Sequence, residues 1–351
     1  MGFRDSFSRA FQGLSWKAPE IKPPQQTPEV RAKKERLLNV KGAIYEIPKR
    51  AKDRVSEDTA LIDEELMLCI VADGVSSGKN GKIASRLAVE TLRDEIQQRQ
   101  GLGNGEVFNE ALMEQAMRRA SEAIKADIVE HPEHRGMNTT LSAVLIFEVE
   151  AEKAYAVVGH VGDSRAYQFQ LKSGALLPLT QDDNDIRSYQ ESGEISADEA
   201  RAIEQSSQEG RDVVLKNPKL SARRLYSQRA KITKSLVATK ENGQRAYNVK
   251  TFNVEDGDII FTVSDGISDV LTEDRILQIL REGFAQEKGV SDIFAQMAQE
   301  AASDTSLRQK GKEGDDISVA GFGVKRVVAQ REREEQMIKE QIEAIRAGLT
   351  T

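Results

Sequence analysis

Two aspartates each stand directly after an apolar, strand-forming run and directly before a glycine. The first run, LCIVADG, ends at Asp73 and Gly74, and the second, IIFTVSDG, ends at Asp265 and Gly266. Each run predicts a buried strand, and the glycine lets the chain turn sharply where the strand ends. One such pair is a common turn signal. Two such strands side by side would bring two carboxylates together, and oxygen ligands of this kind bind hard divalent cations.

Other acidic residues stand where the chain is expected to reverse. Glu57 and Asp58 are adjacent in a polar segment. Asp163 follows one predicted strand, and Asp315 precedes another. If Asp73, Asp265 and Asp315 converged at the strand ends without a counter-charge, they would repel one another, so their convergence favours a bound cation. Every candidate ligand offers oxygen, and the 3 histidines do not cluster with the single cysteine, Cys69, so the pattern predicts Mg²⁺ or Mn²⁺ rather than zinc.

The composition fits one large domain with tails. The 351 residues carry a net charge of −7, with acidic and basic residues interspersed, so no broad basic surface for nucleic acid is expected. Cys69 is the only cysteine, which rules out an intramolecular disulfide and agrees with a reducing, cytoplasmic setting. No apolar run of about eighteen residues occurs, so we expect no transmembrane segment. We also expect a monomer.

Segments at both ends differ from the rest of the chain. Residues 1–36 hold phenylalanines at helical spacing and then a proline-rich stretch, which predicts an amphipathic segment on a linker. Its low basic charge favours a protein partner over a membrane surface. Residues 327–351 are dominated by charged and polar side chains and predict a surface helix. The main domain is expected at residues 37–326.

Strands and helices alternate in pairs along this domain. Two predicted helices, at about residues 83–96 and 108–123, follow the first strands, and a hairpin follows at Leu141–Val149 and Tyr155–Val161. Two more helices come late in the chain, the first capped by Thr272. This order lacks the strand-helix-strand rhythm of a parallel sheet, so it predicts an α+β fold with antiparallel sheets.

Eight short motifs occur in an order and at spacings that indicate a family. They are SED at 56–58, VADG at 71–74, NTTL at 138–141, GDSRAY at 162–167, LTQD at 179–182, ITKSLV at 232–237, SDGISD at 264–269 and DDISV at 315–319. Together they closely resemble the metal-dependent protein serine/threonine phosphatases, the PPM or type 2C family in its bacterial form, over about residues 39–325. The resemblance implies a four-layer αββα sandwich, in which two antiparallel β-sheets are flanked by pairs of helices.

The resemblance also implies a site for two Mn²⁺ or Mg²⁺ ions. The implied ligands are Asp73 as the bridge, Asp265 and Asp315 at one ion, Glu57 and the carbonyl of Gly74 at the other, and Asp58 through a bound water. A hydroxide that bridges the two ions would attack the phosphorus of phosphoserine or phosphothreonine in line with the leaving oxygen.

Asp163 and Asp269 match positions that the family associates with a third, weaker metal ion. Each residue also has an ordinary structural alternative. Asp163 could simply occupy a tight turn, and Asp269 could cap the start of a helix. The sequence leaves both alternatives open.

Three positions depart from the family pattern. Asp53 stands where the family has an arginine that grips the phosphate, and Arg54 could take that role by a one-residue shift or be a solvated surface arginine. Asp316 replaces a usual asparagine and competes with Asp315, which the following Ile-Ser-Val strand favours as the ligand. Val75 stands where some members carry a histidine proposed as proton donor, which bacterial members often lack.

A polar segment at about residues 182–231 resembles the flap beside the active site of bacterial members, and its second part is longer than usual. The resemblance implies a signalling enzyme that dephosphorylates proteins, with Asp73, Asp265 and Arg54 in catalytic roles. The alternative is a catalytically weak or dead relative that binds phosphoproteins or regulates a partner. A two-metal nuclease would need a basic groove, which this acidic chain does not predict. A cysteine phosphatase is excluded because Cys69 lies inside a strand.

Overall fold

The computed structural model describes residues 38–48, 55–75, 80–101, 109–150, 153–204, 206, 210–227, 232–237, 247–303 and 315–326. The chain divides into two units, Met1–Glu35 and Arg36–Thr351, and every described residue belongs to the second. The predicted N-terminal amphipathic segment, the predicted C-terminal helix and Arg54 lie outside the described residues. No helix in the described ranges combines the length and the apolar character needed to cross a membrane.

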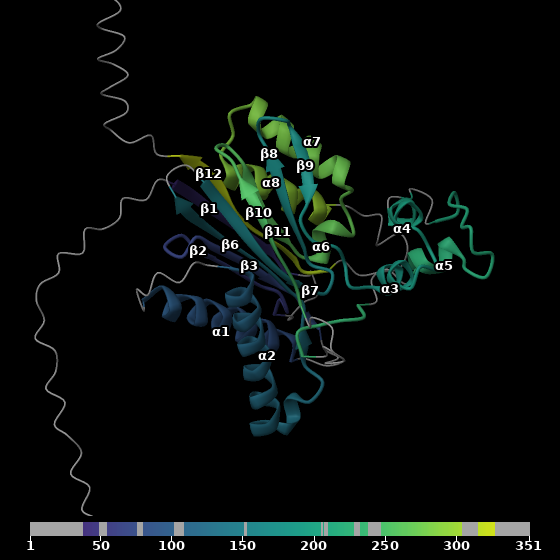
Figure 1. Ribbon diagram of the computed structural model, residues 1–351, viewed down its shortest axis with the longest axis horizontal. Coiled ribbons are helices and arrows are strands. Elements are labelled where there is room, and N and C mark those ends of the chain that lie inside the picture. The colour runs from purple at the N-terminus through teal and green to yellow at the C-terminus, as the bar shows by residue number, and fades with distance from the viewer. Residues whose placement is uncertain are drawn as a thin grey trace, which may run out of the picture. The chain divides into compact units, whose positions relative to one another are not determined.

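Two five-stranded antiparallel sheets form the centre of the domain (Figure 1). In spatial order, the first sheet consists of β1 (Leu38–Ile47), β12 (Ile317–Arg326), β11 (Ile259–Val263), β8 (Arg165–Gln170) and β9 (Ala175–Pro178). The second consists of β10 (Asn248–Val254), β7 (Lys153–Val161), β6 (Leu141–Glu150), β3 (Leu68–Ala72) and β2 (Thr59–Asp63). A short ladder joins β4 (Gly74–Val75) to β5 (Asn138–Thr139).

Two long helices cover the outer face of the second sheet (Figure 1). They are α1 (Gly81–Gly101) and α2 (Glu110–Glu130). Leu92 and Met117 from these helices belong to one buried cluster with Ile70 of β3. The apolar stripe of each helix therefore packs on the sheet, as the helical spacing predicts.

A second pair of helices covers the outer face of the first sheet (Figure 1). They are α7 (Glu273–Ala285) and α8 (Val290–Ser303), and Ile279 and Phe294 from them pack with Phe261 of β11. Two short elements complete this part of the description, namely α6 (Asp265–Ser268) and a 3₁₀ turn, η1 (Pro132–His134).

A third apolar layer lies between the two sheets. Cys69 and Val71 of β3 belong to it together with Ile260 and Phe322 of the other sheet. Because helices cover one face of β3 and the first sheet covers the other, every residue of β3 is buried. This double burial explains why the strand is continuously apolar instead of alternating. The predicted αββα sandwich is confirmed.

Local sequence signals locate several elements well. Thr272 caps α7, and its side chain accepts a hydrogen bond from the Arg275 N–H at 3.2 Å, as predicted. The predicted hairpin is formed by β6 and β7, whose antiparallel register pairs Leu141 with Val161. Caps and hairpins depend on residues that are close together in the sequence. One sequence, without related sequences, is therefore enough to predict them.

The predicted flap contains three short helices with a small core of their own. They are α3 (Asp185–Glu191), α4 (Ala197–Glu204) and α5 (Ala222–Ser227), and they share a buried cluster that includes Ile203 and Leu225. Figure 1 shows them grouped at one side of the sheets, away from the helices that cover the sheet faces. The flap is therefore a packed module.

Candidate active site

Asp73 follows β3 directly, and the NTTL segment holds its backbone. The Asp73 N–H donates to Thr140 Oγ1 at 3.0 Å, and its carbonyl accepts from the Thr140 N–H at 2.9 Å and the Thr139 hydroxyl at 2.8 Å. These bonds satisfy the main-chain groups that lose their ladder partners where the strand ends. The Asp73 side chain therefore leaves the sheet from a fixed position.

Gly74 and Gly81 bring a carbonyl and a carboxylate together. A Cβ atom on Gly74 would overlap the backbone of Gly81, and one on Gly81 would lie 2.5 Å from the Gly74 carbonyl oxygen and 3.1 Å from the carboxyl carbon of Glu57. Glu57 also accepts a hydrogen bond from the Gly74 N–H at its own carbonyl, at 3.2 Å. Only glycine permits backbones to approach so closely. The two predicted ligands of the second cation thus lie around the same point.

Asp265 is the first residue of α6, and only Ser264 separates it from the last residue of β11, Val263. The turn packs tightly on the start of β12, because a Cβ atom on Gly266 would overlap the carbonyl oxygen of Asp316. The Ser264 N–H also donates to the Ser318 carbonyl at 3.0 Å. These contacts place Asp265 beside the acidic pair that precedes β12.

The two aspartates of that pair differ in their surroundings. Asp316 is buried, and its Oδ2 accepts from the Glu57 N–H at 2.8 Å. Asp315 is exposed, and its Oδ1 accepts from the Asp316 N–H at 2.9 Å. Asp316 therefore fixes the segment that carries Glu57, and this structural role favours Asp315 as the cation ligand of the two.

Burial and mutual repulsion raise the pKa values of the strand-end carboxyls. The pKa of Asp73 lies well above its ordinary value, first because of burial and then because of the charge on Asp265. The pKa of Asp265 is raised in the same way, by burial and then by the charges on Asp163 and Asp315. Such mutual effects require carboxyls that lie close together.

Among the predicted ligands, two buried carboxyl oxygens have no hydrogen-bond partner in the described residues. They are Oδ2 of Asp58 and Oδ1 of Asp265. Burial also raises the pKa of Asp58 to about 7, although the nearby hydroxyls of Ser318 and Ser264 partly offset this effect. A buried carboxylate oxygen without a partner is unfavourable unless a positive charge binds it. These atoms mark a place that favours a cation.

The set of donors fits a hard divalent cation. Every group gathered here offers a carboxylate or carbonyl oxygen, which is the ligand type that Mg²⁺ and Mn²⁺ prefer. In the described part of the chain, no three acidic, histidine or cysteine side chains form a group that could hold a metal ion as they stand. The carboxyls therefore share one region without being arranged as a closed set of ligands.

Asp163 and Asp269 adjoin the same region. Asp163 follows Gly162, whose φ of +105° makes the tight turn that the sequence predicts. Burial raises the pKa of Asp163 to about 8, and the charges on Asp182 and Asp269 contribute to this rise. The alternative role of Asp269 as a helix-start cap is wrong, because α6 already begins at Asp265 and the Asp269 N–H donates back to the Asp265 carbonyl at 2.8 Å.

The base of the flap is tied to the turn that carries Asp163. Asp183 is buried, its N–H donates to the Gly162 carbonyl at 2.7 Å, and its Oδ2 accepts from the Gly162 N–H at 3.2 Å. Its Oδ1 pairs with Lys234 at 3.0 Å, and its carbonyl accepts from the Thr233 N–H at 2.7 Å. One residue thus joins both ends of the flap to the candidate site.

Comparison with known proteins settles the family. A family model described as protein phosphatase 2C matches residues 49–310. The chain belongs to the protein phosphatase 2C family. The resemblance carried by the eight motifs is thereby confirmed.

Two curated relatives illustrate how much of the sequence is shared. The serine/threonine protein phosphatase PstP of Mycobacterium tuberculosis is 28% identical over 215 residues, which is 61% of this chain and 34% of PstP. The serine/threonine phosphatase stp of Listeria monocytogenes is 31% identical over 137 residues, which is 38% of this chain and 50% of stp. The matches therefore span between a third and a half of the length of these relatives.

Solved structures share the fold at lower sequence identity. The structure of PstP/Ppp from Mycobacterium tuberculosis superposes with a TM-score of 0.58 at 21% identity and covers 82% of this chain and 99% of that one. Stp1 from Staphylococcus aureus gives a TM-score of 0.58 at 19% identity and covers 81% of this chain and 95% of that one. At these identities the likeness concerns the sandwich itself.

Two residues of this protein phosphatase 2C domain that shape the site were not predicted from the sequence. Gly81 opens α1, where a weak helix former signals a close approach of two backbones. Asp183 directly follows the last residue of the LTQD motif, and only its distant partners reveal its role. The predicted phosphate-binding residue Arg54 lies outside the described residues.

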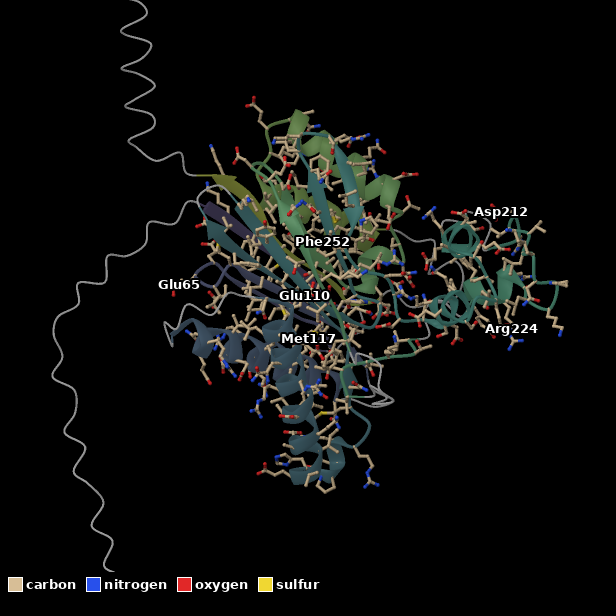
Figure 2. All side chains as sticks on the ribbon, viewed as in Figure 1. Glu65, Glu110, Met117, Asp212, Arg224 and Phe252 are labelled. Carbon is tan, nitrogen blue, oxygen red and sulfur yellow. The ribbon has the colours of Figure 1, made fainter. Side chains whose placement is uncertain are left out.

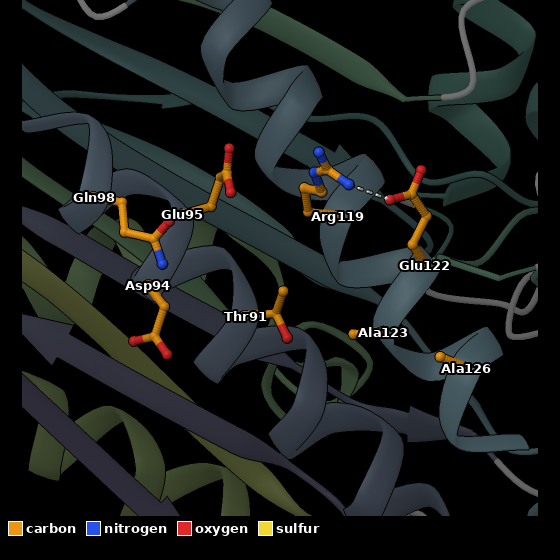
Figure 3. Close-up of a pocket in the computed structure, with 8 residues that line it drawn as sticks. All are labelled: Thr91, Asp94, Glu95, Gln98, Arg119, Glu122, Ala123 and Ala126. Atoms are coloured by element: carbon orange, nitrogen blue, oxygen red, sulfur yellow. Dashed lines mark hydrogen bonds and ion pairs between the residues drawn. The ribbon is translucent and has the colours of Figure 1, made fainter. Parts of the chain in front are cut away.

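A hollow on the outer helix layer is separate from the carboxyls of the protein phosphatase 2C site. It lies between α1 and α2 and has a volume of about 470 Å³, and Arg119 pairs there with Glu122 at 3.0 Å (Figure 3). Its lining residues are Thr91, Asp94, Glu95, Gln98, Arg119, Glu122, Ala123 and Ala126. None of the predicted site residues lines it.

Proposed function

We propose that this chain is an active metal-dependent phosphatase that hydrolyses phosphoserine and phosphothreonine in proteins. The observation that carries the proposal is the group of half-buried carboxyls around Asp73 and Asp265, where neighbouring carboxylates raise the pKa of both and the buried Oδ1 atom of Asp265 has no partner among the described residues. Such a group is unfavourable alone and becomes favourable when divalent cations bind. The catalytic domain of PstP has been solved in complex with two manganese ions. We propose Mn²⁺ or Mg²⁺ here.

The proposed division of roles follows the placement of the donors. Asp73 would bind both cations, and the remaining donors would be Asp265 and Asp315 at one cation, and Glu57 and the Gly74 carbonyl at the other. When bound, the two cations would supply a water of lowered pKa as the nucleophile and would neutralise charge on the phosphate.

Other residues of the chain position these donors, and one accepts a hydrogen bond from a water. Thr139 and Thr140 hold the backbone of Asp73, and Asp316 holds that of Glu57. Asp58 would accept a hydrogen bond from a water at this end of the site. Because each donor has a fixed main chain, little rearrangement would be needed at the moment of reaction.

Three further residues complete the proposal. Asp163 and Asp269 would bind a third, weaker cation, and the raised pKa of Asp163, caused first by burial and then by nearby carboxylates, supports this role. Arg54 would bind the phosphate, because a planar guanidinium can donate to two phosphate oxygens at once.

Hydrolysis of a small aryl phosphate with added Mn²⁺ tests the proposed activity. Wild-type protein should turn over, whereas Asp73→Asn should lose more than about 100-fold in kcat/KM because it removes the shared ligand. Thermal unfolding of the variant checks that it is folded. A wild-type protein that binds Mn²⁺ in a calorimetric titration but shows no turnover would establish the alternative, a relative that only binds phosphoproteins.

We also propose a monomeric, cytoplasmic enzyme of a signalling pathway. Support comes from the single cysteine, which lies buried in β3 and would gain nothing from an oxidising compartment. The segment at residues 1–36 would contact a protein partner, as its apolar spacing predicts.

A further inference from the structure

The outer part of the flap is strongly basic in an otherwise acidic chain. Residues 211–231 contain seven basic side chains and one acidic one, Asp212, and so carry a net charge of +6. The chain as a whole carries −7, which leaves −13 on all the other residues. A concentration of one sign within 21 residues creates a local field opposite to that of the rest of the surface.

These basic side chains are presented on a packed support. Lys216, Lys219, Arg223 and Arg224 are exposed, whereas Ala222 before the two arginines and Leu225 after them are buried in the small core of the flap. Figure 2 shows Arg224 and Asp212 in the group formed by α4 and α5. The core holds the backbone beneath these four exposed side chains, which are called the basic face below.

Within the described residues, the charges of Lys219, Arg223 and Arg224 are not neutralised by an ion pair. The neighbouring acidic residue Glu199 is engaged with main-chain groups. Its carboxylate accepts from the Lys216 N–H at 2.6 Å and from the Ser196 N–H at 2.8 Å, and these bonds lower its pKa to about 2. The flap thus uses its nearby carboxylate to hold the backbone and leaves the basic side chains exposed to solvent.

The basic face is connected to the candidate site through the base of the flap. Asp183 binds Gly162 beside Asp163, and it also pairs with Lys234 where the flap returns to the sheets. An isolated antiparallel bridge between Asn184 and Ile232 closes the base. The module that carries the basic side chains is therefore anchored at the turn that carries Asp163.

We propose that this basic face binds acidic side chains that flank the phosphorylated residue of a protein substrate. The inference rests on the proposed phosphatase function and adds the class of substrate. Carboxylates of the substrate would otherwise meet the net charge of −13 on the residues outside 211–231, so residues 211–231 provide the complementary charge. A long nucleic acid would need basic surface over many phosphates, which this compact face does not offer.

Two phosphopeptides that differ only in their flanking residues test the proposal. One carries four aspartates around a phosphothreonine, and the other carries four asparagines. At low salt, wild-type protein should show a kcat/KM about tenfold higher for the acidic peptide, since several charge pairs each contribute modestly. Equal values for the two peptides would overturn the proposal.

A triple charge reversal assigns the effect to this face. Lys219→Glu, Arg223→Glu and Arg224→Glu together should abolish the preference for the acidic peptide and leave aryl phosphate hydrolysis unchanged. The matched control reverses Lys125, Lys153 and Lys250, which are also exposed and lie on α2, β7 and β10. It changes the net charge equally and should keep the preference. Equal losses in both triple variants would show that only the overall charge matters.

Binding measured without turnover separates this proposal from the phosphatase function. Fluorescence anisotropy of the labelled acidic peptide, with full-length protein in EDTA, should show binding that weakens from 50 to 300 mM salt and is lost in the flap variant. If the protein binds the acidic peptide in this way but hydrolyses no aryl phosphate, the proposed role of the basic face stands and the proposed phosphatase activity is refuted. A single-stranded oligonucleotide that binds more tightly than the peptide would instead identify a nucleic-acid surface.

Discussion

The candidate site and the outer flap both gather charges of one sign, but they do so in opposite surroundings. The carboxyls of Asp73 and Asp265 are half-buried, and neighbouring carboxylates raise the pKa of each, whereas the guanidinium groups of Arg223 and Arg224 are exposed to water. Water screens like charges on a surface, so their repulsion is weak there. In the interior the same repulsion is strong. The comparison indicates that the half-buried group favours a bound cation, while the exposed group can remain charged until a partner binds.

The largest effect is expected from disturbing the backbone that brings the predicted cation ligands together. In Gly81→Ala, the new Cβ would lie 2.5 Å from the Gly74 carbonyl oxygen and would force it away from Glu57. Mn²⁺ affinity should fall roughly 10- to 100-fold, as expected when the groups that orient metal ligands are displaced. Calorimetric titration with Mn²⁺ measures the loss.

Gly289→Ala is the matched control for that change. A Cβ atom on Gly289 would meet only Asp292 Oδ2, at 3.8 Å, which is ordinary contact. Its Mn²⁺ affinity should equal that of the wild type. If Gly81→Ala also bound Mn²⁺ normally, the proposed pairing of Glu57 with the Gly74 carbonyl would be refuted.

A second test compares pH dependence with and without metal. In EDTA the folded state holds protons on Asp73, Asp265, Asp58 and Asp163 at pH values where the unfolded chain has released them, because their folded pKa values are raised. The stability contributed by these protons is present below about pH 4, the ordinary carboxyl range, and is lost as pH rises through the raised values. The melting temperature in EDTA should therefore fall toward pH 8, and Mn²⁺ should restore it most strongly there. His160, whose pKa is lowered by burial, acts in the opposite direction near neutral pH.

Asp265→Asn should sharpen this result by removing one of the repelling charges. The variant in EDTA at pH 8 should melt at least about 2 °C above the wild type, although it should lose activity. Asp198→Asn is the control, since that side chain is 91% exposed and should change the melting temperature little. A melting temperature for Asp265→Asn below that of the wild type would mean that repulsion between the carboxyls is not the dominant effect.

The smallest effect on activity is expected at Asp183, which connects the candidate site to the flap. Asp183→Asn removes the ion pair with Lys234 and should lower the free energy of unfolding by about 1–3 kcal/mol, because the buried groups lose a charged partner. KM for a phosphopeptide should rise more than KM for an aryl phosphate, since only the peptide reaches the flap. Glu255→Gln removes a surface ion pair with Lys172 and serves as the control. Equal changes in both KM values would limit Asp183 to a structural role.

The sequence predicts those parts of the site that depend on local pattern. Asp73 and Asp265 were found because each ends a continuously apolar strand, and that apolar character reflects burial on both faces of the sheet. The order of the motifs also predicts the sandwich, which the structure confirms. Turn and cap signals at Gly162 and Thr272 are equally local.

The remainder depends on contacts between residues far apart in the chain. The hydrogen bond from the Glu57 N–H to Asp316 joins residues separated by 259 positions, and no periodicity in the sequence encodes it. The same holds for the tie between Asp183 and Lys234. The cap predicted as an alternative for Asp269 failed because α6 starts at Asp265, so a short turn of helix begins inside the motif.

The closed base of the flap has a consequence for how this family can diversify. Asn184 and Ile232 stand next to each other across an antiparallel bridge, and Leu236 beyond them donates to the carbonyl of Thr139, which in turn holds Asp73. Residues inserted or deleted between the two ends would lengthen or shorten a loop whose anchors stay in place, and the entropy of closing such a loop grows only slowly with its length. The sequence and length of the flap can therefore vary, and its recognition surface with them, while the residues that anchor it and the carboxyls of the site stay the same.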